Sequence, residues 1–151
     1  MPSIGRGESV WRRPRPYGAD EIHLTAGAPL TRIPFRKGGV DRALVSSVPR
    51  TFPAVMEVMN NGGIISFIGI EYGEGATISF NANDFHFKKL QLRASFASPA
   101  LYFPLCLQWM KDGHVDGRTV ISHVMPLEQI EQALLMLRDD HAGTLKIIIT
   151  P

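Results

Sequence analysis

Apolar positions in residues 40–72 follow a pattern that predicts a strand, a helix, a glycine turn and a second strand. In the helix, predicted over 51–60, apolar residues recur at i, i+3, i+4 and i+7 and form one stripe: Phe52, Val55, Met56 and Met59. The second strand, predicted over 64–70, is almost wholly apolar, so it needs cover on both faces. These features predict a βαβ unit in a parallel sheet flanked by helices, which is an α/β fold.

The helix over 51–60 has start and stop signals. The Thr51 side chain is expected to cap it, and Pro53 lies in its first turn, where a missing N–H is not needed. The Asn-Asn-Gly-Gly run at 60–63 is expected to form the turn that follows.

The rest of the chain alternates between strand and helix patterns. Strands over 22–25, 42–46, 64–70 and 90–96 are expected to form one partial parallel sheet. A short helix is expected within 81–89, and longer helices over 101–112 and 127–139. The last helix lies between strands predicted at 119–124 and 145–150, so the chain is expected to end in a strand–helix–strand segment.

Residues 76–80 are predicted to form a half-exposed strand, because Ile78 and Phe80 alternate with polar neighbours. An uncharged strand at the edge of a sheet is a template for pairing with a second copy. The chain is therefore expected to form a homo-oligomer through this edge.

Residues 1–16 form a basic arm that contains Trp11 and no apolar period, so they are expected to lack regular structure. Two interpretations of the arm stay open. We favour a solvated tail, because four arginines without a folded platform specify little. The alternative is a nucleic-acid-associated protein whose arginines contact phosphates while Trp11 stacks on a base.

Composition bounds the class of protein. A chain that is 44% hydrophobic and 20% charged has ordinary globular usage. The basic excess lies in residues 1–50, which carry nine Lys and Arg against four Asp and Glu. Cys106 is the only cysteine, which excludes an intrachain disulfide.

No apolar run approaches the roughly 20 residues of a membrane span, and the N-terminus lacks the apolar core of a signal peptide. A cytoplasmic location without membrane contact is expected.

Motifs for several catalytic chemistries are missing. The five histidines are scattered, and none has a metal-ligand spacing to another His, Cys or carboxylate. The sequence contains no Gly-x-Ser-x-Gly elbow, no Gly-x-x-x-x-Gly-Lys-Ser/Thr loop and no Gly-x-Gly-x-x-Gly turn. Hydrolase, P-loop and complete dinucleotide-binding sites are therefore not expected.

A set of short motifs occurs in a family-like order and spacing: Tyr-Gly-Ala-Asp (17–20), Gly-Gly-Val-Asp (38–41), Asn-Asn-Gly-Gly (60–63), Ser-Phe-Ile-Gly (66–69), Leu-Arg-Ala-Ser-Phe (92–96), Pro-Leu-Glu-Gln-Ile-Glu-Gln-Ala (126–133) and Gly-Thr-Leu-Lys-Ile (143–147). From Tyr17 to Pro151 the chain resembles the C-terminal half of zinc-type medium-chain alcohol and polyol dehydrogenases, the group that includes threonine and sorbitol dehydrogenases. Each motif alone is weak, and the ordered set carries the resemblance.

The resemblance implies a division into domains. After the arm of 1–16, residues 17–118 would be a partial Rossmann nucleotide-binding domain, and 119–151 a C-terminal return segment of the catalytic domain. The zinc ligands, the glycine-rich phosphate turn and the acidic residue that binds the adenosine ribose would lie before residue 1.

Nine residues match cofactor-lining positions of the family. They are Ser46, Ser47, Val48, Ile68, Gly69, Ile70, Ala94, Ser95 and Lys146. The first three match a strand end beside the nicotinamide ribose, where many relatives have a smaller residue than Val48. Gly69 would let the dinucleotide approach the next strand end. Ala94 and Ser95 match a Gly-Ser pair that faces the carboxamide, and Lys146 matches a residue that reaches a cofactor phosphate.

The resulting hypothesis is a truncated zinc-type dehydrogenase. The parent reaction would be oxidation of a secondary alcohol or polyol with NAD or NADP. Weak cofactor binding and no alcohol oxidation are expected of this chain alone, since it supplies neither zinc ligands nor the phosphate turn. Two alternatives remain: a non-enzymatic dimerisation or interaction module, and the nucleic-acid-associated protein described above.

Overall fold

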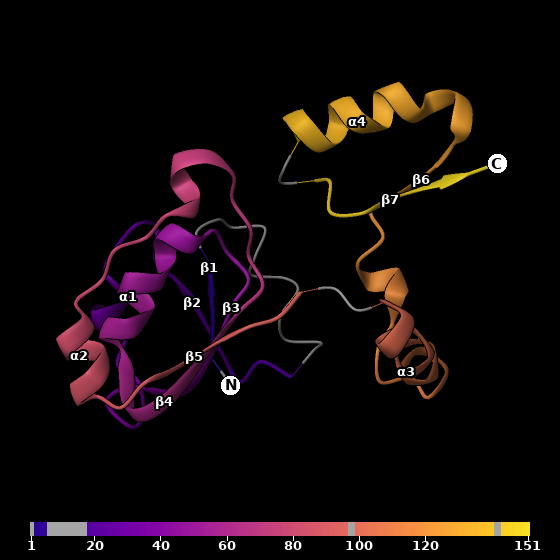
Figure 1. Cartoon of the computed structure of the whole chain (residues 1–151). Coiled ribbons are helices and arrows are strands. Elements are labelled where there is room, and N and C mark those ends of the chain that lie inside the picture. Colours follow the sequence, from indigo (N-terminus) through magenta and orange to yellow (C-terminus); the bar gives the residue numbers. More distant parts are fainter. Residues whose placement is uncertain (1, 6–17, 97–98, 141–142) are drawn as a thin grey trace. The chain divides into compact units, whose positions relative to one another are not determined.

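The computed structural model describes residues 2–5, 18–96, 99–140 and 143–151. The chain divides into two compact units, one of Gly27–Ala97 and one of Met1–Ala26 with Ser98–Pro151. Figure 1 labels the strands and helices of both units. The predicted α/β class, with parallel strands and flanking helices, is confirmed. The boundaries predicted at residues 16 and 118 differ from those of the units and stay predictions about domains.

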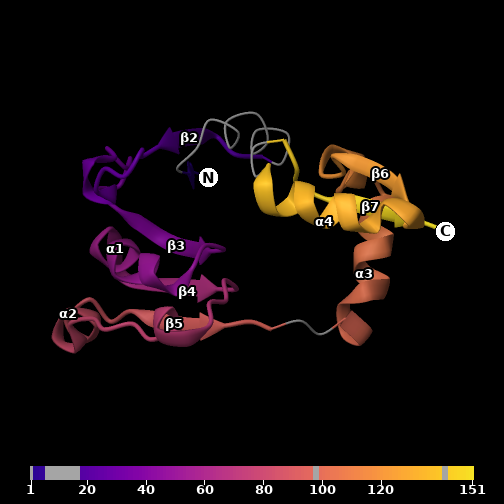
Figure 2. The same cartoon turned by 90° about the horizontal axis from the view of Figure 1, so that it is seen from above.

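The Gly27–Ala97 unit is built on a parallel sheet of three strands in the order β3-β4-β5, which run side by side in Figure 2. Its elements are β3 (Val40–Val45), α1 (Phe52–Glu57), β4 (Met59–Phe67), α2 (Ala82–Phe87) and β5 (Gln91–Ala94), with short 3-10 helices at Leu30–Arg32, Pro49–Thr51 and Gly73–Ala76. The strands are aligned so that Val45 pairs with Phe67, which pairs with Ala94. The predicted strands over 42–46, 64–70 and 90–96 are therefore confirmed, with shifted boundaries.

The core of this unit lies on one face of the sheet. Its buried members are Val45, Phe52, Met56, Met59, Ile65 and Leu90. Ile65 is fully buried at the centre of β4. Side chains alternate between faces along a strand, so Leu44 lies on the face opposite Val45, and it is 69% exposed. Within the described part of this unit only one face is covered, although the apolar pattern predicts cover on both.

Helix α1 is shorter than predicted and ends at Glu57 rather than at 60. Met59, which completes the apolar stripe, pairs with Val40 at the start of β4. The glycine turn predicted at 60–63 is instead an irregularity inside β4. Val40 pairs with Met59 and Arg42 pairs with Ile64, so the residues between Met59 and Ile64 outnumber those between Val40 and Arg42 and are not all paired. Gly62 lies there with a φ of 74°, a left-handed conformation that glycine adopts without strain.

The predicted cap of α1 is wrong. Thr51 precedes the helix without a side-chain cap hydrogen bond. Its hydroxyl instead donates to the Val48 carbonyl at 2.9 Å and lies 2.7 Å from the Ser47 hydroxyl. By contrast, the Asn81 side chain caps α2, where it accepts from the backbone N–H of Asn83 at 2.9 Å.

The strand predicted at 76–80 is not present. Ala76 ends a 3-10 helix, and 77–80 have no regular structure. Ile78 packs against the core instead, and the Phe80 ring contacts Phe52 and Phe85 at centroid distances of 6.0 and 5.6 Å. Contacts of these two side chains with the core and with the rings of α1 and α2 take the place of strand pairing. Self-association through this segment stays a prediction, without the strand edge that motivated it.

In the other unit, β2 (Glu21–Leu24) pairs in parallel with β1 (Pro2–Gly5) and not with the three-stranded sheet. The prediction that 22–25 join that sheet is therefore wrong. In a Rossmann sheet of order 3-2-1-4-5-6, two strands lie between the third strand and the fourth, so these two do not pair directly. The prediction of an irregular arm is wrong for Pro2–Gly5, because β2 offers these residues backbone partners. Residues 6–17, with Trp11, lie outside the described residues.

The C-terminal strand–helix–strand segment is confirmed. Strands β6 (His123–Pro126) and β7 (Ile147–Thr150) pair in parallel, and α4 (Ile130–Asp139) forms the crossover between them. Ala133 is the buried residue of α4. The first strand begins later than the predicted 119, because Gly117–Thr119 form a 3-10 helix that Asp116 caps.

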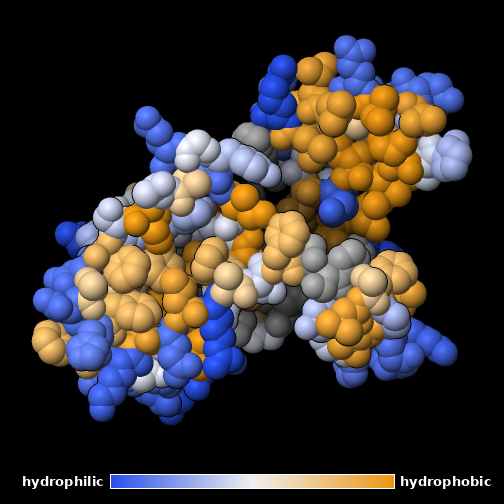
Figure 3. Space-filling view, viewed as in Figure 1, coloured by the Kyte–Doolittle hydropathy of each residue, from blue (hydrophilic) through white to orange (hydrophobic). Residues whose placement is uncertain are grey.

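Helix α3 (Pro99–Lys111) is rich in apolar side chains that stay exposed, among them Leu101, Phe103 and Leu107. Several apolar side chains of α4 are exposed too, and Figure 3 shows hydrophobic surface over this unit. A helix that is apolar on all sides is typically buried. The described residues leave large apolar side chains of α3 exposed. No helix among them is both long and apolar enough to cross a membrane.

Candidate functional site

The carboxyl ends of β3, β4 and β5 meet at one edge of the sheet, because the strands are parallel and in register. The Ile68 N–H donates to the Val45 carbonyl at 3.0 Å, and the Ser95 N–H donates to the Phe67 carbonyl at 3.2 Å. These bonds extend the ladder one residue past the ends of β4 and β5. All the predicted site residues except Lys146 therefore lie along this edge, which we call the carboxyl edge: Ser46, Ser47, Val48, Ile68, Gly69, Ile70, Ala94 and Ser95.

Gly69 is packed against the backbone that follows β3. A Cβ atom at this position would clash with the Ser47 carbonyl oxygen and lie 2.7 Å from the carbonyl carbon. Both atoms belong to the backbone of Ser47, so they cannot rotate away from the new Cβ as the end of a flexible side chain could. Glycine is thus required here by contact within the chain, whether or not a dinucleotide also approaches this strand end.

The loop after β3 is held by its own hydrogen bonds. The Val48 carbonyl accepts from the Thr51 N–H at 3.1 Å and from the Thr51 hydroxyl. Val48 is half-buried at the start of the 3-10 helix Pro49–Thr51, while Ser46 and Ser47 remain exposed. The two serines therefore present polar groups to solvent at the carboxyl edge.

An apolar pocket of about 270 Å³ opens beside these strand ends. It is lined by Val45, Ser47, Pro49, Phe52, Phe67, Ala76, Ile78, Phe80 and Leu92. Of the predicted site residues only Ser47 contributes to it. The sequence analysis missed its other walls, although one signal was available: parallel strands that end together, followed by the first turn of a helix, typically border a cleft.

Glu71 is a charged residue of this edge that the sequence analysis also missed. One carboxylate oxygen lies 3.6 Å from the Arg50 guanidinium. The other oxygen is buried and has no hydrogen-bond partner among the described residues. The predicted strand ends at 70, and Glu71 follows it directly. A polar residue in that position is the signal that would have indicated its place in the site.

Lys146 belongs to the other compact unit. Its carbonyl accepts from the Ser122 N–H and hydroxyl, both at 2.9 Å, and its N–H donates to the Ser122 hydroxyl at 3.2 Å. These bonds fix the backbone before β7 and leave the exposed side chain to solvent. The reach of this lysine to a cofactor phosphate stays a prediction.

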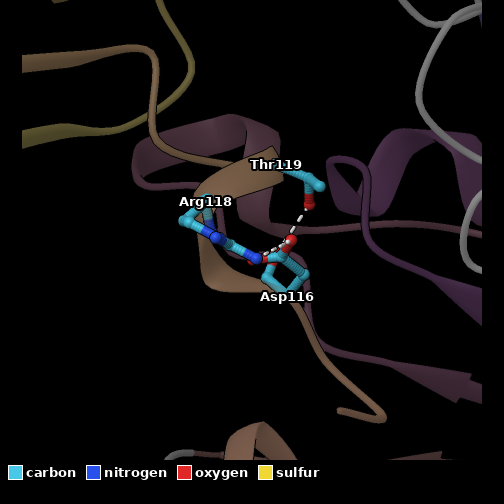
Figure 4. Close-up of polar contacts among 3 residues, drawn as sticks. All are labelled: Asp116, Arg118 and Thr119. Atoms are coloured by element: carbon cyan, nitrogen blue, oxygen red, sulfur yellow. Dashed lines mark hydrogen bonds and ion pairs between the residues drawn. The ribbon is translucent and has the colours of Figure 1, made fainter.

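A polar cluster of the same unit lies at Asp116, Arg118 and Thr119, where Arg118 points toward Asp116 (Figure 4). The Arg118 side chain donates to the Asp116 carboxylate at 2.9 and 3.1 Å, and the Arg118 N–H donates to it at 3.0 Å. The side-chain bonds are the main cause that lowers the pKa of Asp116, and the backbone bond adds to it. This cluster caps a 3-10 helix, so its geometry is accounted for by folding.

Replacing Arg118 with Gln is expected to raise the pKa of Asp116 toward 3.8, because the guanidinium is lost while the backbone N–H remains. The folded-state pKa is lowered, so the stabilisation is complete above about pH 3.8 and is lost as the pH falls through that lower pKa. In the variant the stabilisation is smaller, and its loss with falling pH is complete at a higher pH. An NMR pH titration of the Asp116 carboxyl measures the shift, with Arg138→Gln as the control, because Arg138 pairs with Asp139. An unchanged pKa in Arg118→Gln would contradict the assignment.

Solved structures match this chain in fold. The match to a short-chain alcohol dehydrogenase (RspB) from E. coli CFT073, complexed with NADH, has a TM-score of 0.87 and 16% identity over 99% of this chain and 44% of that one. L-idonate 5-dehydrogenase from E. coli K-12 matches with a TM-score of 0.83 and 19% identity over 99% and 42%. A Sinorhizobium meliloti protein described as a zinc-binding dehydrogenase, bound to NADP, matches with a TM-score of 0.83 and 20% identity over 99% and 44%.

This chain therefore spans less than half the length of the dehydrogenases whose fold it shares. No model of a known protein family matches the sequence, and no curated protein matches it. The predicted resemblance to alcohol and polyol dehydrogenases is confirmed in fold.

Proposed function

We propose that this chain is part of a nicotinamide-dependent alcohol or polyol dehydrogenase of the zinc-type medium-chain family, and that its carboxyl edge faces the nicotinamide half of the cofactor. The observation that carries the proposal is the convergence of three parallel strand ends beside an apolar pocket. In open parallel sheets, ligands bind outside the carboxyl ends of the strands. Structural neighbours solved with NADH and NADP support a nicotinamide cofactor.

The part of this chain in the reaction is to bind and orient the cofactor. The parent reaction is hydride transfer between a secondary alcohol or polyol and the nicotinamide ring. Ser46, Ile68 and Ser95 are exposed along the carboxyl edge, where they offer hydroxyl and backbone groups to the ribose and carboxamide. The pocket beside them offers an apolar surface next to that edge.

Zinc does not fit the described residues. They include no group of three or more His, Cys, Asp or Glu side chains that could hold a metal ion. In the parent family, zinc polarises the alcohol oxygen. The residues of this chain are therefore assigned to the cofactor and not to the metal.

The cofactor assignment predicts weak binding that depends on the nicotinamide half. Much of the hold of a Rossmann domain on a dinucleotide comes from the glycine-rich turn and the acidic ribose-binding residue, and this sequence contains no Gly-x-Gly-x-x-Gly. If those contacts contribute about 4 kcal/mol, a micromolar site weakens nearly a thousandfold, to the millimolar range.

NMR titrations of the chain with nicotinamide mononucleotide and with AMP test this assignment. We expect millimolar nicotinamide mononucleotide to shift the amide signals of Ser46, Ile68 and Ser95, and AMP to leave them unchanged. The amide of Asn83, on α2, is the internal control. Shifts with AMP alone, or none at the carboxyl edge with either compound, would remove the proposal. No observation on the described residues favours the interaction module or the nucleic-acid-associated protein over this function.

A further inference from the structure

The sequence contains a single Asn-Gly pair, Asn61-Gly62, and it lies in the irregular part of β4. Asparagine is a chemically labile residue. It is most labile before glycine, because the next backbone nitrogen can attack the side-chain amide and glycine has no side chain to obstruct that attack. Both residues are exposed to solvent. The pair therefore has the composition and the exposure of a deamidation site.

The reaction at such a site uses the backbone nitrogen of the second residue as the nucleophile. The Gly62 nitrogen loses its proton and attacks the side-chain carbonyl carbon of Asn61. A C–N bond forms, and the side-chain nitrogen leaves as ammonia, which takes up the proton. Solvent water then adds to the succinimide ring and breaks one of its C–N bonds. The product is aspartate, or isoaspartate in which the chain runs through the side-chain carbon, and no oxidant or reductant is needed.

The fold holds the attacking nitrogen in a hydrogen bond. The Gly62 N–H donates to the Lys88 carbonyl at 2.7 Å. Lys88 is fixed in turn, because its ammonium group donates to the Met56 and Glu57 carbonyls at 3.1 and 2.9 Å. These carbonyls lie at the C-terminal end of α1, where a cation is favoured. Lys88 also follows the last residue of α2, so one residue holds the Gly62 amide to both helices.

We propose that Asn61 is a deamidation site that the fold keeps latent, and that it reacts only when the hydrogen bond between Gly62 and Lys88 opens. An N–H that is donated to a carbonyl is harder to deprotonate. Amide hydrogen exchange of Gly62 requires release of the same N–H. Exchange and deamidation are therefore slowed by the same factor relative to an unfolded peptide. The site lies at the start of β4 and is independent of the proposed cofactor site.

Two measurements on the full chain test the proposal. Mass spectrometry of digests, after incubation at mildly alkaline pH, follows deamidation of Asn61, and NMR follows exchange of the Gly62 amide. A synthetic peptide of residues 57–67 gives the unprotected rates. We expect Asn61 to deamidate at least about tenfold more slowly in the folded chain than in the peptide, and the two slowing factors to agree within about threefold. Asn83, which precedes Asp84, is the internal control and is expected to stay unmodified.

A substitution of Lys88 tests what keeps the site latent. Lys88→Met removes the hydrogen bonds of the ammonium group to α1 and retains the carbonyl that accepts from Gly62. Hydrogen bonds from a charged group are strong, so both rates are expected to rise at least about tenfold. Lys89→Met is the matched control, because Lys89 is the exposed neighbour, and both rates are expected to stay unchanged. If Lys88→Met does not fold, urea below the unfolding transition takes its place, and both rates of the unmodified chain are expected to rise in parallel.

Three results would overturn the proposal. One is deamidation of Asn61 in the folded chain at the rate of the peptide, which would mean that the hydrogen bond of Gly62 gives no protection. Another is modification of Asn60 or Asn83 before Asn61. The third is faster exchange of the Gly62 amide in Lys88→Met, or in urea, without faster deamidation, which would show that the two reactions do not share one opening.

Discussion

Replacing Phe52 with Ala is expected to lower the free energy of unfolding by about 3–5 kcal/mol. Phe52 is 2% exposed and lies at the start of α1, where it joins the helix to the sheet core. Its ring packs edge-on against Phe67, with centroids 6.4 Å apart, and at 6.0 Å from Phe80. The alanine leaves a void beside the apolar pocket that these rings already border. Urea unfolding followed by circular dichroism measures the loss.

Phe87→Ala is the matched control for this prediction. Phe87 belongs to α2 in the same unit, and its side chain is 74% exposed. Removal of an exposed ring is expected to change the free energy of unfolding by no more than about 0.5 kcal/mol. Equal losses in the two variants would mean that the core is not packed around Phe52.

Local patterns predicted the elements of the three-stranded sheet. The strand pattern at 42–46 and the apolar run at 64–70 are properties of neighbouring residues, and they are visible without the fold. The end of α1 was misplaced because Met59 satisfies two patterns at once. It falls on the helical stripe at i+7, and it also pairs with Val40 in the sheet. The pairing is a contact between distant residues, so the helix period alone could not predict it.

The errors in the first and third quarters of the chain have the same cause. Ile78 and Phe80 alternate as a strand would, yet Ile78 packs on the core and the Phe80 ring contacts Phe52 and Phe85 at tilted angles. Strand β2 was predicted correctly as an element, but its partner is Pro2–Gly5. Which strand pairs with which depends on the whole topology, and short apolar segments carry little information about it.

The sequence predicted the residues of the candidate site that lie at strand ends, and it missed those that reach the site through side-chain packing. Parallel strands place their carboxyl ends together, so Ser46, Ile68 and Ser95 could be grouped from the sequence. Two of the aromatic walls of the pocket, Phe52 and Phe80, come from α1 and from the irregular segment after Ala76, which sequence patterns did not bring to this edge. Gly69 was assigned to cofactor approach, and the structure adds a reason within the chain.

Replacing Gly69 with Ala is expected to lower the free energy of unfolding by about 2–3 kcal/mol in the absence of any cofactor. The added Cβ would meet the Ser47 carbonyl group and lie 3.3 Å from the Ser46 carbonyl oxygen. Both neighbours are backbone atoms of the loop after β3, which is held by the hydrogen bonds of Thr51 to Val48. Relief of the clash therefore requires the loop to move away from β4 or the strand end to shift. Urea unfolding of the cofactor-free protein measures the effect.

Gly117→Ala is the control for Gly69→Ala, because a Cβ at Gly117 meets no atom within 4 Å. It is expected to change the free energy of unfolding by no more than about 0.5 kcal/mol. Measuring the free energy of unfolding without cofactor distinguishes two roles of Gly69, namely close contact within the chain and approach of a dinucleotide. If glycine served only to let a dinucleotide approach, Gly69→Ala would keep the stability of the free protein and lose only the response to nicotinamide mononucleotide. A loss of stability without ligand instead shows that the carboxyl edge is shaped by contact between the segments that follow β3 and β4 before any cofactor binds.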